Sequence, residues 1–327
     1  MRILVTGATG FLGSRLLARL ASEADQLRVL RRKNSLLDLI KNIKFEDYIG
    51  DITNPDDVMS AVAGCDVVFH VAASVSYWDK LKEKQFDVNV NGTKYIVEAC
   101  LKHKVKRLIC TSSIVAIGLS RDGGPADEDT TYNLWPYRIG YCDTKYLAEV
   151  EVQRGVRNGL DAVVVNPGAI FGPGDLRRFK GNLYGGSVWR GIFYVGGGIA
   201  TVDVDDVVEG HIRAWQKGRK GERYLLTNEN CSFKEIYDTI MKALGKKRRH
   251  FRVRIPTFLV FTLAYIADFI SKVTNTKPLV TLHMAKFTKL HLYFSNEKAK
   301  HDLDMNFRSL RESIERSISW FKEHGYL

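Results

Sequence analysis

The N-terminus of the chain combines a short apolar run with three closely spaced glycines. Residues 2–6 are typical of a buried parallel strand, and Gly7, Gly10 and Gly13 follow directly. Residues 14–20 then carry leucines at helical spacing. Strand, glycine turn and helix in this order are the structural context that a dinucleotide fingerprint requires.

The glycine turn predicts a binding site for a pyrophosphate group. Glycines permit a tight turn and let the backbone approach the ligand, and the following helix offers free N–H groups and a partial positive charge. The spacing G-x-x-G-x-x-G is one residue wider than the standard form. An ordinary glycine turn is the alternative interpretation, but the flanking strand and helix favour the nucleotide.

The residues around the second predicted strand indicate which nucleotide is preferred. An NAD site usually has an acidic side chain at the end of this strand. The strand is predicted over 27–30, and Asp25 stands before it, at the wrong end. Arg31, Arg32 and Lys33 stand at the correct end. Because a guanidinium pairs bidentately with phosphate oxygens, the sequence predicts NADP(H), with NAD(H) or a merely solvated basic turn as alternatives.

A tyrosine and a lysine four residues apart supply candidate catalytic groups. Tyr141 and Lys145 share one helix face if 141–149 is helical, and that segment has no Gly or Pro. A phenol has an ordinary pKa of about 10, which a nearby ammonium lowers toward the range useful for proton transfer. Ser113 ends the apolar run 107–113, where its hydroxyl would hold a substrate carbonyl oxygen. A surface helix pair is the alternative.

The order of these motifs resembles the extended short-chain dehydrogenase/reductase family over nearly the whole chain. The matching segments are Thr6–Gly13, Gly50–Ile52, His70–Ala73, Asn89–Thr93, Thr111–Ser113, Tyr141–Lys145 and Asn166–Gly168. In that family Ser, Tyr and Lys form the catalytic set, which implies Ser113, Tyr141 and Lys145 by matching position. Ser113 is preferred to Ser112 because it stands five residues before Gly118, as in the family pattern.

The same resemblance implies a set of cofactor-binding residues. Asp51 matches the residue that holds the adenine, and residues 71–73 match the turn that lines the ADP-ribose. Pro167 and Ile170 match the turn beside the nicotinamide, and Asn89 matches an asparagine whose role is often structural. Together with Arg31 and Arg32, the expected set is Gly7, Thr9, Gly10, Phe11, Leu12, Gly13, Asp51, Ile52, Val71, Ala72, Ala73, Thr111, Tyr141, Lys145, Pro167 and Ile170.

Strand and helix signals alternate up to about residue 165, as expected of an α/β, Rossmann-type, doubly wound parallel sheet. Strands are predicted over 2–6, 27–30, 45–49, 66–71, 106–111 and 161–166, with helices beginning near Gly13, Asp56, Lys84 and Gly140. The expected domains are 1–171 with 199–227 for the nucleotide, and 172–198 with 228–327 for a smaller, mainly helical substrate lobe. The glycine-rich segment 172–198 is a candidate mobile substrate loop. Asp205 and Asp206 are interpreted as helix-capping residues.

Nearly all of the net charge of +12 belongs to the C-terminal third, since residues 217–327 hold 22 Lys/Arg and 11 Asp/Glu. The basic run 246–254 is followed directly by the apolar segment 255–266. Such a pair suggests peripheral contact with an anionic membrane through 246–266, although the uncharged stretch is shorter than the ~20 residues of a span. The favoured interpretation is a lobe helix whose apolar face packs on the core. No recognition motif accompanies the charge, so no nucleic-acid partner is expected.

The remaining composition is that of an ordinary globular protein. Hydrophobic residues make up 45% of the 327 residues, enough for a sizeable core. The five cysteines show no C-x-x-C spacing, which indicates reduced thiols, and the eight histidines form no ligand pattern, so no metal is expected. No signal peptide is visible, because the first core strand begins at residue 2. We expect a cytoplasmic monomer or homodimer, with membrane association as the alternative.

The C-terminal third resembles particular groups within this family. Segments 255–256, 277–281 and 294–299 resemble 3β-hydroxysteroid dehydrogenases, dihydroflavonol-reductase-like proteins and hopanoid-associated epimerases. This resemblance implies an NADP(H)-dependent carbonyl reductase or alcohol dehydrogenase acting on a bulky hydrophobic small molecule of dihydroflavonol, steroid or terpenoid type. A sugar-nucleotide epimerase or dehydratase is the alternative, and a non-catalytic dinucleotide sensor is a lesser one.

Overall fold

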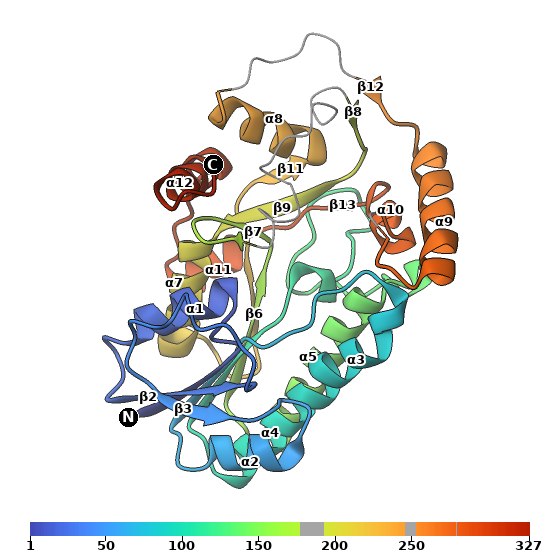
Figure 1. Cartoon of the computed structure of the whole chain (residues 1–327). Helices are drawn as coiled ribbons and strands as arrows, with labels where there is room; N and C mark the ends of the chain where they lie inside the picture. The colour runs from blue at the N-terminus through green and yellow to red at the C-terminus, as the bar shows by residue number, and fades with distance from the viewer. Residues whose placement is uncertain (177–192, 246–252, 279) are drawn as a thin grey trace.

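A seven-stranded parallel sheet lies at the centre of the molecule (Figure 1). The computed structural model describes residues 1–176, 193–245, 253–278 and 280–327. The strands of this sheet are β1 (Arg2–Thr6), β2 (Gln26–Arg31), β3 (Glu46–Ile49), β4 (Val67–His70), β5 (Arg107–Thr111), β6 (Ala162–Pro167) and β10 (Arg223–Leu226). Their order, β10-β6-β5-β4-β1-β2-β3, confirms the Rossmann-type, doubly wound sheet.

Helices cover both faces of this sheet. One face carries α1 (Phe11–Leu20), α7 (Val204–Lys217) and α11 (Glu297–Leu303), and the other carries α2 (Pro55–Val62), α4 (Gly92–Lys102) and α5 (Gly140–Arg157). Alternate side chains of a strand point to opposite faces. In β1, accordingly, Ile3 and Val5 enter the first core and Leu4 enters the second. Burial on both faces explains why the central strands, such as β1, β4 and β6, read as apolar runs, whereas the edge strand β3 does not.

Short helical segments connect the main elements. They are η1 (Asp79–Leu81), α3 (Lys82–Phe86), η2 (Asp87–Asn91), η3 (Ile114–Ala116) and η4 (Trp135–Tyr137). The segment η2 is a π-helical turn that joins α3 to α4, so 82–102 is continuously helical. Such turns shift the side chains that follow relative to those before, and they often lie at functional sites.

A smaller sheet and several helices form the rest of the molecule. The strands are β7 (Ala169–Phe171), β9 (Gly198–Asp203), β11 (Asn230–Ser232) and β13 (His291–Leu292), with β8 (Phe193–Tyr194) pairing separately with β12 (Val253–Arg254). The helices are α8 (Phe233–Ala243), α9 (Thr257–Thr274), α10 (Leu282–Phe287) and α12 (Leu310–Glu323). Within 199–227, β10 pairs with β6 in the main sheet and α7 packs against one of its faces. The strand β9 does not join the main sheet, because it pairs with β7, β11 and β13.

Two predicted features lie largely outside the described residues. The candidate substrate loop 172–198 includes 177–192, and the basic run 246–254 includes 246–252; both of these parts lie outside the described residues.

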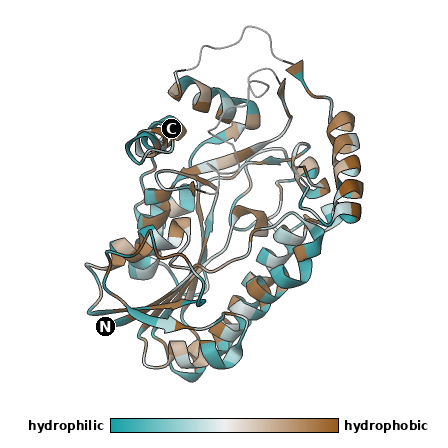
Figure 2. Ribbon diagram, viewed as in Figure 1, coloured by the Kyte–Doolittle hydropathy of each residue, from teal (hydrophilic) through white to brown (hydrophobic). Residues whose placement is uncertain are grey.

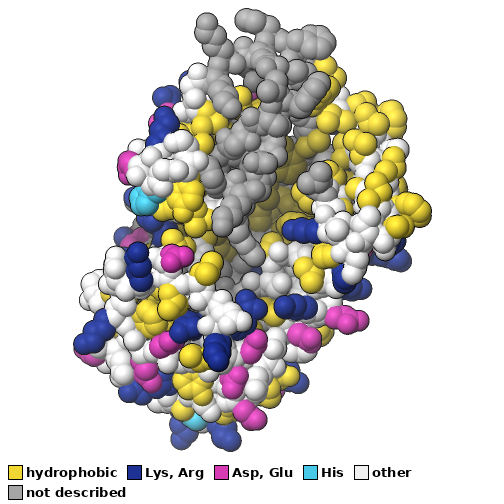
Figure 3. Space-filling model, viewed as in Figure 1, with side chains coloured by type: hydrophobic (Ala, Val, Ile, Leu, Met, Phe, Trp, Pro, Cys, Tyr) yellow, Lys and Arg dark blue, Asp and Glu magenta, His cyan; other side chains and the backbone are white. Residues whose placement is uncertain are grey.

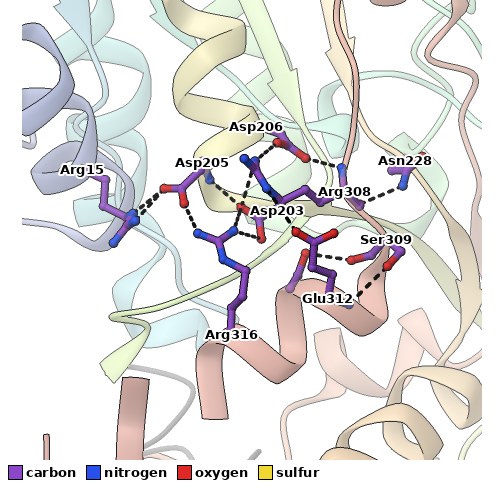
Figure 4. A network of polar contacts seen from close by, with 10 residues as sticks. Arg15, Asp203, Asp205, Asp206, Asn228, Arg308, Ser309, Glu312 and Arg316 are labelled. Atoms are coloured by element: carbon purple, nitrogen blue, oxygen red, sulfur yellow. Dashed lines mark hydrogen bonds and ion pairs between the residues drawn. The ribbon is translucent and has the colours of Figure 1, made fainter. Parts of the chain in front are cut away.

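The cap of α7 is Asp203, whereas the predicted capping residues Asp205 and Asp206 lie within the first turn of the helix. The carboxylate of Asp203 accepts a hydrogen bond from the Asp205 N–H at 2.8 Å. Asp203 is fully buried and also pairs with Arg316 of α12 at 3.0 Å. Asp205 pairs with Arg316 as well, and Asp206 with Arg308, so the three carboxylates bind the C-terminal helix to the nucleotide domain (Figure 4).

The helix α9 differs from the favoured sequence interpretation. Only Val260, Ala264 and Ser271 of this helix are buried. Most of its large apolar side chains are exposed, so its apolar surface is not packed on the core. Of the helices in the described part of the chain, α9 alone is long and apolar enough to cross a membrane.

Candidate active site

The glycine turn between β1 and α1 has the geometry of a nucleotide loop. Gly7 has a positive φ of 71°, and a Cβ there would lie 2.7 Å from the Ala72 nitrogen. A Cβ on Gly13 would lie 2.1 Å from the Gly7 oxygen, so only glycine fits at either position. Gly10 is exposed and precedes the first turn of α1. The first N–H groups of a helix have no partner within the helix, so this turn suits an anionic ligand.

A buried chain of hydrogen bonds fixes the turn after β4. The Ala72 N–H donates to the Thr6 hydroxyl at 3.2 Å, and that hydroxyl lies 2.8 Å from His70 Nδ1. On the other side of the ring, Nε2 lies 3.0 Å from the Thr93 hydroxyl, which donates to the Asn89 carbonyl oxygen at 2.6 Å. Burial lowers the pKa of His70 to about 3, so the ring is neutral. The chain joins three of the sequence motifs into one unit.

The side chain of Asn89 connects this turn to α5. Its Oδ1 accepts from the Ser74 N–H at 2.7 Å, and its Nδ2 donates to the Ser74 carbonyl at 3.0 Å and to Thr144 Oγ1 at 3.1 Å. The Thr144 hydroxyl in turn donates to the Tyr141 carbonyl at 3.0 Å. This geometry fits a structural role for Asn89, which positions the helix that carries Tyr141.

Lys145 is buried at the end of β5, with only 4% of its surface exposed. Its ammonium donates to the Thr111 carbonyl at 2.8 Å. The Thr111 hydroxyl lies 2.7 Å from His211 Nε2, whose Nδ1 lies 2.7 Å from the Val207 carbonyl. Because a carbonyl only accepts, Nδ1 carries the proton and Thr111 donates to Nε2. Burial lowers the pKa of both Lys145 and His211, the latter to about 4.

A second buried group supports Ser113, which begins η3. The Ser113 hydroxyl accepts from the Val115 N–H at 3.4 Å, and the Asn166 amide donates to the Ser113 carbonyl at 3.0 Å. The same amide donates to Glu149 Oε1 at 2.6 Å. Burial raises the pKa of Glu149. Glu149 follows Lys145 by four residues on α5, a helical spacing that could have revealed it in the sequence.

The ring of Tyr141 is part of an aromatic cluster between the nucleotide domain and the lobe. Tyr141 is 9% exposed and contacts the Tyr77 ring edge-on, with centroids 5.8 Å apart. Tyr77 contacts Phe287 of α10 in the same way at 5.5 Å. No pattern in the sequence pointed to Tyr77 or Phe287. Aromatic edges beside Tyr141 favour an apolar ligand over a strongly hydrated one.

The basic turn after β2 keeps one of its two predicted phosphate-binding residues free. The Arg31 guanidinium pairs with Asp47 of the neighbouring strand β3, with Nε 2.7 Å from Oδ1. The Asp47 carboxylate occupies the donor fork of Arg31, and the role of Arg31 at a 2′-phosphate stays a prediction. Arg32 is exposed beside it and is the guanidinium available to a 2′-phosphate. Asp51 stands after β3, where its Oδ1 accepts from the Thr53 N–H at 3.0 Å.

The other predicted residues lie at one edge of the sheet. Strands β1 and β4 are neighbours, and the connections run in opposite directions from this point. Ligands of doubly wound sheets bind outside the carboxyl ends of the strands at such a switch point. Beyond those ends stand Gly7–Gly13 after β1, Asp51 and Ile52 after β3, Val71–Ala73 after β4, Thr111 and Ser113 at β5, and Pro167 and Ile170 at and after the end of β6.

Comparison with known proteins decides the family. Residues 4–255 match the 3-beta hydroxysteroid dehydrogenase/isomerase family. The chain belongs to this family. A Synechocystis sp. protein provisionally named a dihydroflavonol 4-reductase is 32% identical over 99% of this chain and 95% of its own length. Sterol demethylase protein B of Methylococcus capsulatus is 29% identical over the full length of both chains.

Solved structures share the fold of this chain. The crystal structure of gox2253 has a TM-score of 0.84 at 33% identity, covering 99% of each chain. UDP-glucuronic acid 4-epimerase of Bacillus cereus, solved with NAD, has a TM-score of 0.75 at 20% identity, covering 99% of this chain and 100% of its own, and supports the fold alone. The 3-beta hydroxysteroid dehydrogenase family member described here is therefore an NAD(P)-dependent short-chain dehydrogenase/reductase that acts on CH–OH groups, as its motifs predict.

Proposed function

We propose that the protein is an NADP(H)-dependent oxidoreductase that interconverts a carbonyl and an alcohol on a bulky hydrophobic substrate of dihydroflavonol, steroid or terpenoid type. The observation that carries the proposal is the setting of Tyr141. Its helix also holds the buried Lys145 at the carboxyl edge of the sheet, and its ring lies against Tyr77 in an aromatic cluster. The names of the relatives, a dihydroflavonol reductase and sterol enzymes, support a hydrophobic substrate.

Different residues of the chain would bind the cofactor, transfer the proton and position the substrate. The glycine turn and Arg32 would hold the phosphates of NADP(H), which when bound supplies or accepts the hydride. Tyr141 would donate a proton to the carbonyl oxygen in reduction and take it back in oxidation. Ser113 would hold that oxygen beside the phenol. Lys145, buried with its ammonium on the Thr111 carbonyl, would stabilise the phenolate form of Tyr141.

A substrate panel tests the proposal. Purified protein with NADPH or NADP⁺ would be offered a 3β-hydroxysteroid, a dihydroflavonol and UDP-glucose, with nicotinamide absorbance and chromatography of the products as the readouts. We expect net change in absorbance with a hydrophobic substrate. Conversion of UDP-glucose without net nicotinamide turnover would instead indicate an epimerase. Tight dinucleotide binding with no turnover of any substrate would indicate a sensor.

The cofactor preference has its own test in Arg32. Arg32→Ala should weaken NADPH binding by about 1.5–3 kcal/mol, because it removes a charge-assisted contact to the 2′-phosphate. NADH has no phosphate there, so its Kd should change little. Calorimetric titration of both nucleotides measures the difference. The exposed neighbour Lys33, changed to Ala, is the matched control. Equal weakening of both nucleotides by Arg32→Ala, or tighter binding of NADH by the unaltered protein, would refute the assignment.

A further inference from the structure

The surface of α9 is apolar and open to solvent along its whole length. Exposed fractions reach 73% for Phe258, 69% for Phe269 and 71% for Val273. Figures 2 and 3 show hydrophobic residues gathered over this helix. The exposed large apolar side chains are Phe258, Leu259, Leu263, Tyr265, Ile266, Phe269, Ile270 and Val273. A contiguous apolar surface of this kind marks a binding face for another apolar surface.

The opposite side of α9 is held against the lobe. Val260 and Ala264 pack with Ala285 of α10. Near the other end, the Trp78 indole N–H donates to Ser271 Oγ at 3.1 Å, and Ser271 donates to the Thr276 carbonyl at 2.6 Å. A helix fixed along its length in this way lies on the protein surface. Its exposed apolar side can therefore face a membrane while the helix axis lies in the plane of the membrane surface, as in interfacial helices. In this arrangement the helix does not cross the bilayer.

Positive charges outnumber negative ones around α9, although the exposed Asp79 of η1 pairs there with His283 of α10 at 3.3 Å. Among the described residues 253–290 the basic ones are Arg254, Lys272, Lys277, Lys286 and Lys289. The only acidic residue in that range is Asp268, and it pairs with Lys272 at 2.9 Å. Lys289 lies over the Phe261 ring, 4.7 Å from its centroid. An apolar face bordered by cations is complementary to lipid whose headgroups are anionic.

We propose that α9 docks the protein on an anionic lipid surface, with its exposed apolar side chains at the boundary between headgroups and acyl chains. A second copy of the chain is the competing occupant. Two copies related by a twofold axis would bring the same face together. Their cationic borders would then repel each other, whereas anionic lipid neutralises them.

The position of α9 connects this surface to the catalytic tyrosine. Trp78, which donates a hydrogen bond to Ser271 of α9, directly follows Tyr77 in the chain, and Tyr77 contacts Tyr141. Lys80 also contacts Asn275, just after α9. A lipophilic substrate leaving the bilayer at α9 would therefore meet the segment 77–80 before Tyr141. This step rests on the proposed function, whereas the docking itself does not.

Vesicle flotation tests the docking without any substrate. The full chain would be mixed with vesicles of phosphatidylcholine alone, or of equal parts phosphatidylcholine and phosphatidylglycerol, at low and at high salt. We expect flotation with the anionic vesicles at low salt and much less at high salt, because surface attraction is screened within about 8–10 Å at ordinary ionic strength. Absence of flotation with anionic vesicles at low salt would overturn the proposal and leave the proposed activity untouched.

Substitutions on the exposed side of α9 locate the contact. Leu263→Glu with Phe269→Glu should lower vesicle binding about tenfold or more, because charges oppose insertion of the apolar face. Leu327→Glu, an exposed apolar position at the C-terminus on the far side of the molecule from α9, is the matched control and should bind like the unaltered protein (Figure 1). Unchanged binding by the double variant, at an unchanged melting temperature, would refute α9 as the contact.

Sedimentation without vesicles separates the competing occupant. If a second copy covers α9, the unaltered chain should sediment as a dimer, and Leu263→Glu with Phe269→Glu should produce a monomer. That result, together with no vesicle binding, would replace the lipid proposal with a dimer interface. A sedimentation profile that is the same for both proteins, with vesicle binding lost only in the variant, supports lipid.

Discussion

Tyr141→Phe should lower turnover of a verified substrate by about a hundredfold or more. The change keeps the ring, and with it the edge-on contact to Tyr77 at 5.8 Å, but removes the proton that the carbonyl oxygen needs. Since the loss belongs to the chemical step, kcat should fall while the Kd of NADPH stays close to that of the unaltered protein. Steady-state kinetics and a fluorescence titration of NADPH measure the two quantities.

The matched control for this experiment is another tyrosine of the same helix. Tyr146 stacks on Tyr132 with ring centroids 4.4 Å apart and lies five residues beyond Tyr141. Tyr146→Phe should retain near-normal turnover. Near-normal turnover in Tyr141→Phe would show that Tyr141 has no catalytic role. The proposed nucleotide site would be unaffected by that result.

The structural features around the candidate site that the sequence predicted are local in the chain. The glycine turn needs Gly7 and Gly13 because a side chain at either would collide with backbone atoms, and such a requirement is visible as glycines between a strand and a helix. Tyr141 and Lys145 share a helix face for the same kind of reason, since four residues span about one turn. The parallel, doubly wound sheet followed from alternating strands and helices, although its strand order did not.

The parts that the sequence did not predict depend on contacts between distant segments. Arg31 is occupied because β2 pairs with β3 in a register that brings Asp47 within reach, and no spacing in the chain specifies that register. Tyr77 lies against Tyr141 in the same region where Asn89 hydrogen-bonds both Ser74 and Thr144 of α5. Such pairs are separated by many residues, and local propensity carries no information on them.

The strand β9 and the helix α9 show two further limits of pattern reading. An apolar run such as 199–204 predicts a strand but not the sheet that it joins, and β9 pairs outside the main sheet. In α9 apolar residues occur on all sides, so periodicity cannot separate a face that packs on the lobe from one that is exposed. Burial, which is a property of the whole fold, decides both cases.

Lys145→Met should impair both chemistry and nucleotide binding, unlike Tyr141→Phe. Methionine retains much of the lysine stem at this buried position but loses the ammonium that now donates to the Thr111 carbonyl. Without that charge nothing favours the phenolate, so kcat should fall about a hundredfold or more. The Kd of NADPH should rise at the same time, because under the proposed function the ammonium would also contact the nicotinamide ribose. Lys84→Met, at an exposed lysine of α3, is the control and should change neither quantity.

The pH dependence of activity gives a second view of Lys145. Burial lowers the pKa of this lysine below its ordinary value of about 10.4, and the active form carries the charge. As pH rises, the ammonium therefore loses its proton at a lower pH than an exposed lysine does. We expect kcat to begin to fall at a pH below about 10.4. Lys145→Arg keeps a charge that does not titrate in this range, so whatever activity it retains should lack that alkaline fall. An unchanged NADPH Kd and an unchanged alkaline limb in both variants would show that Lys145 only packs against β5.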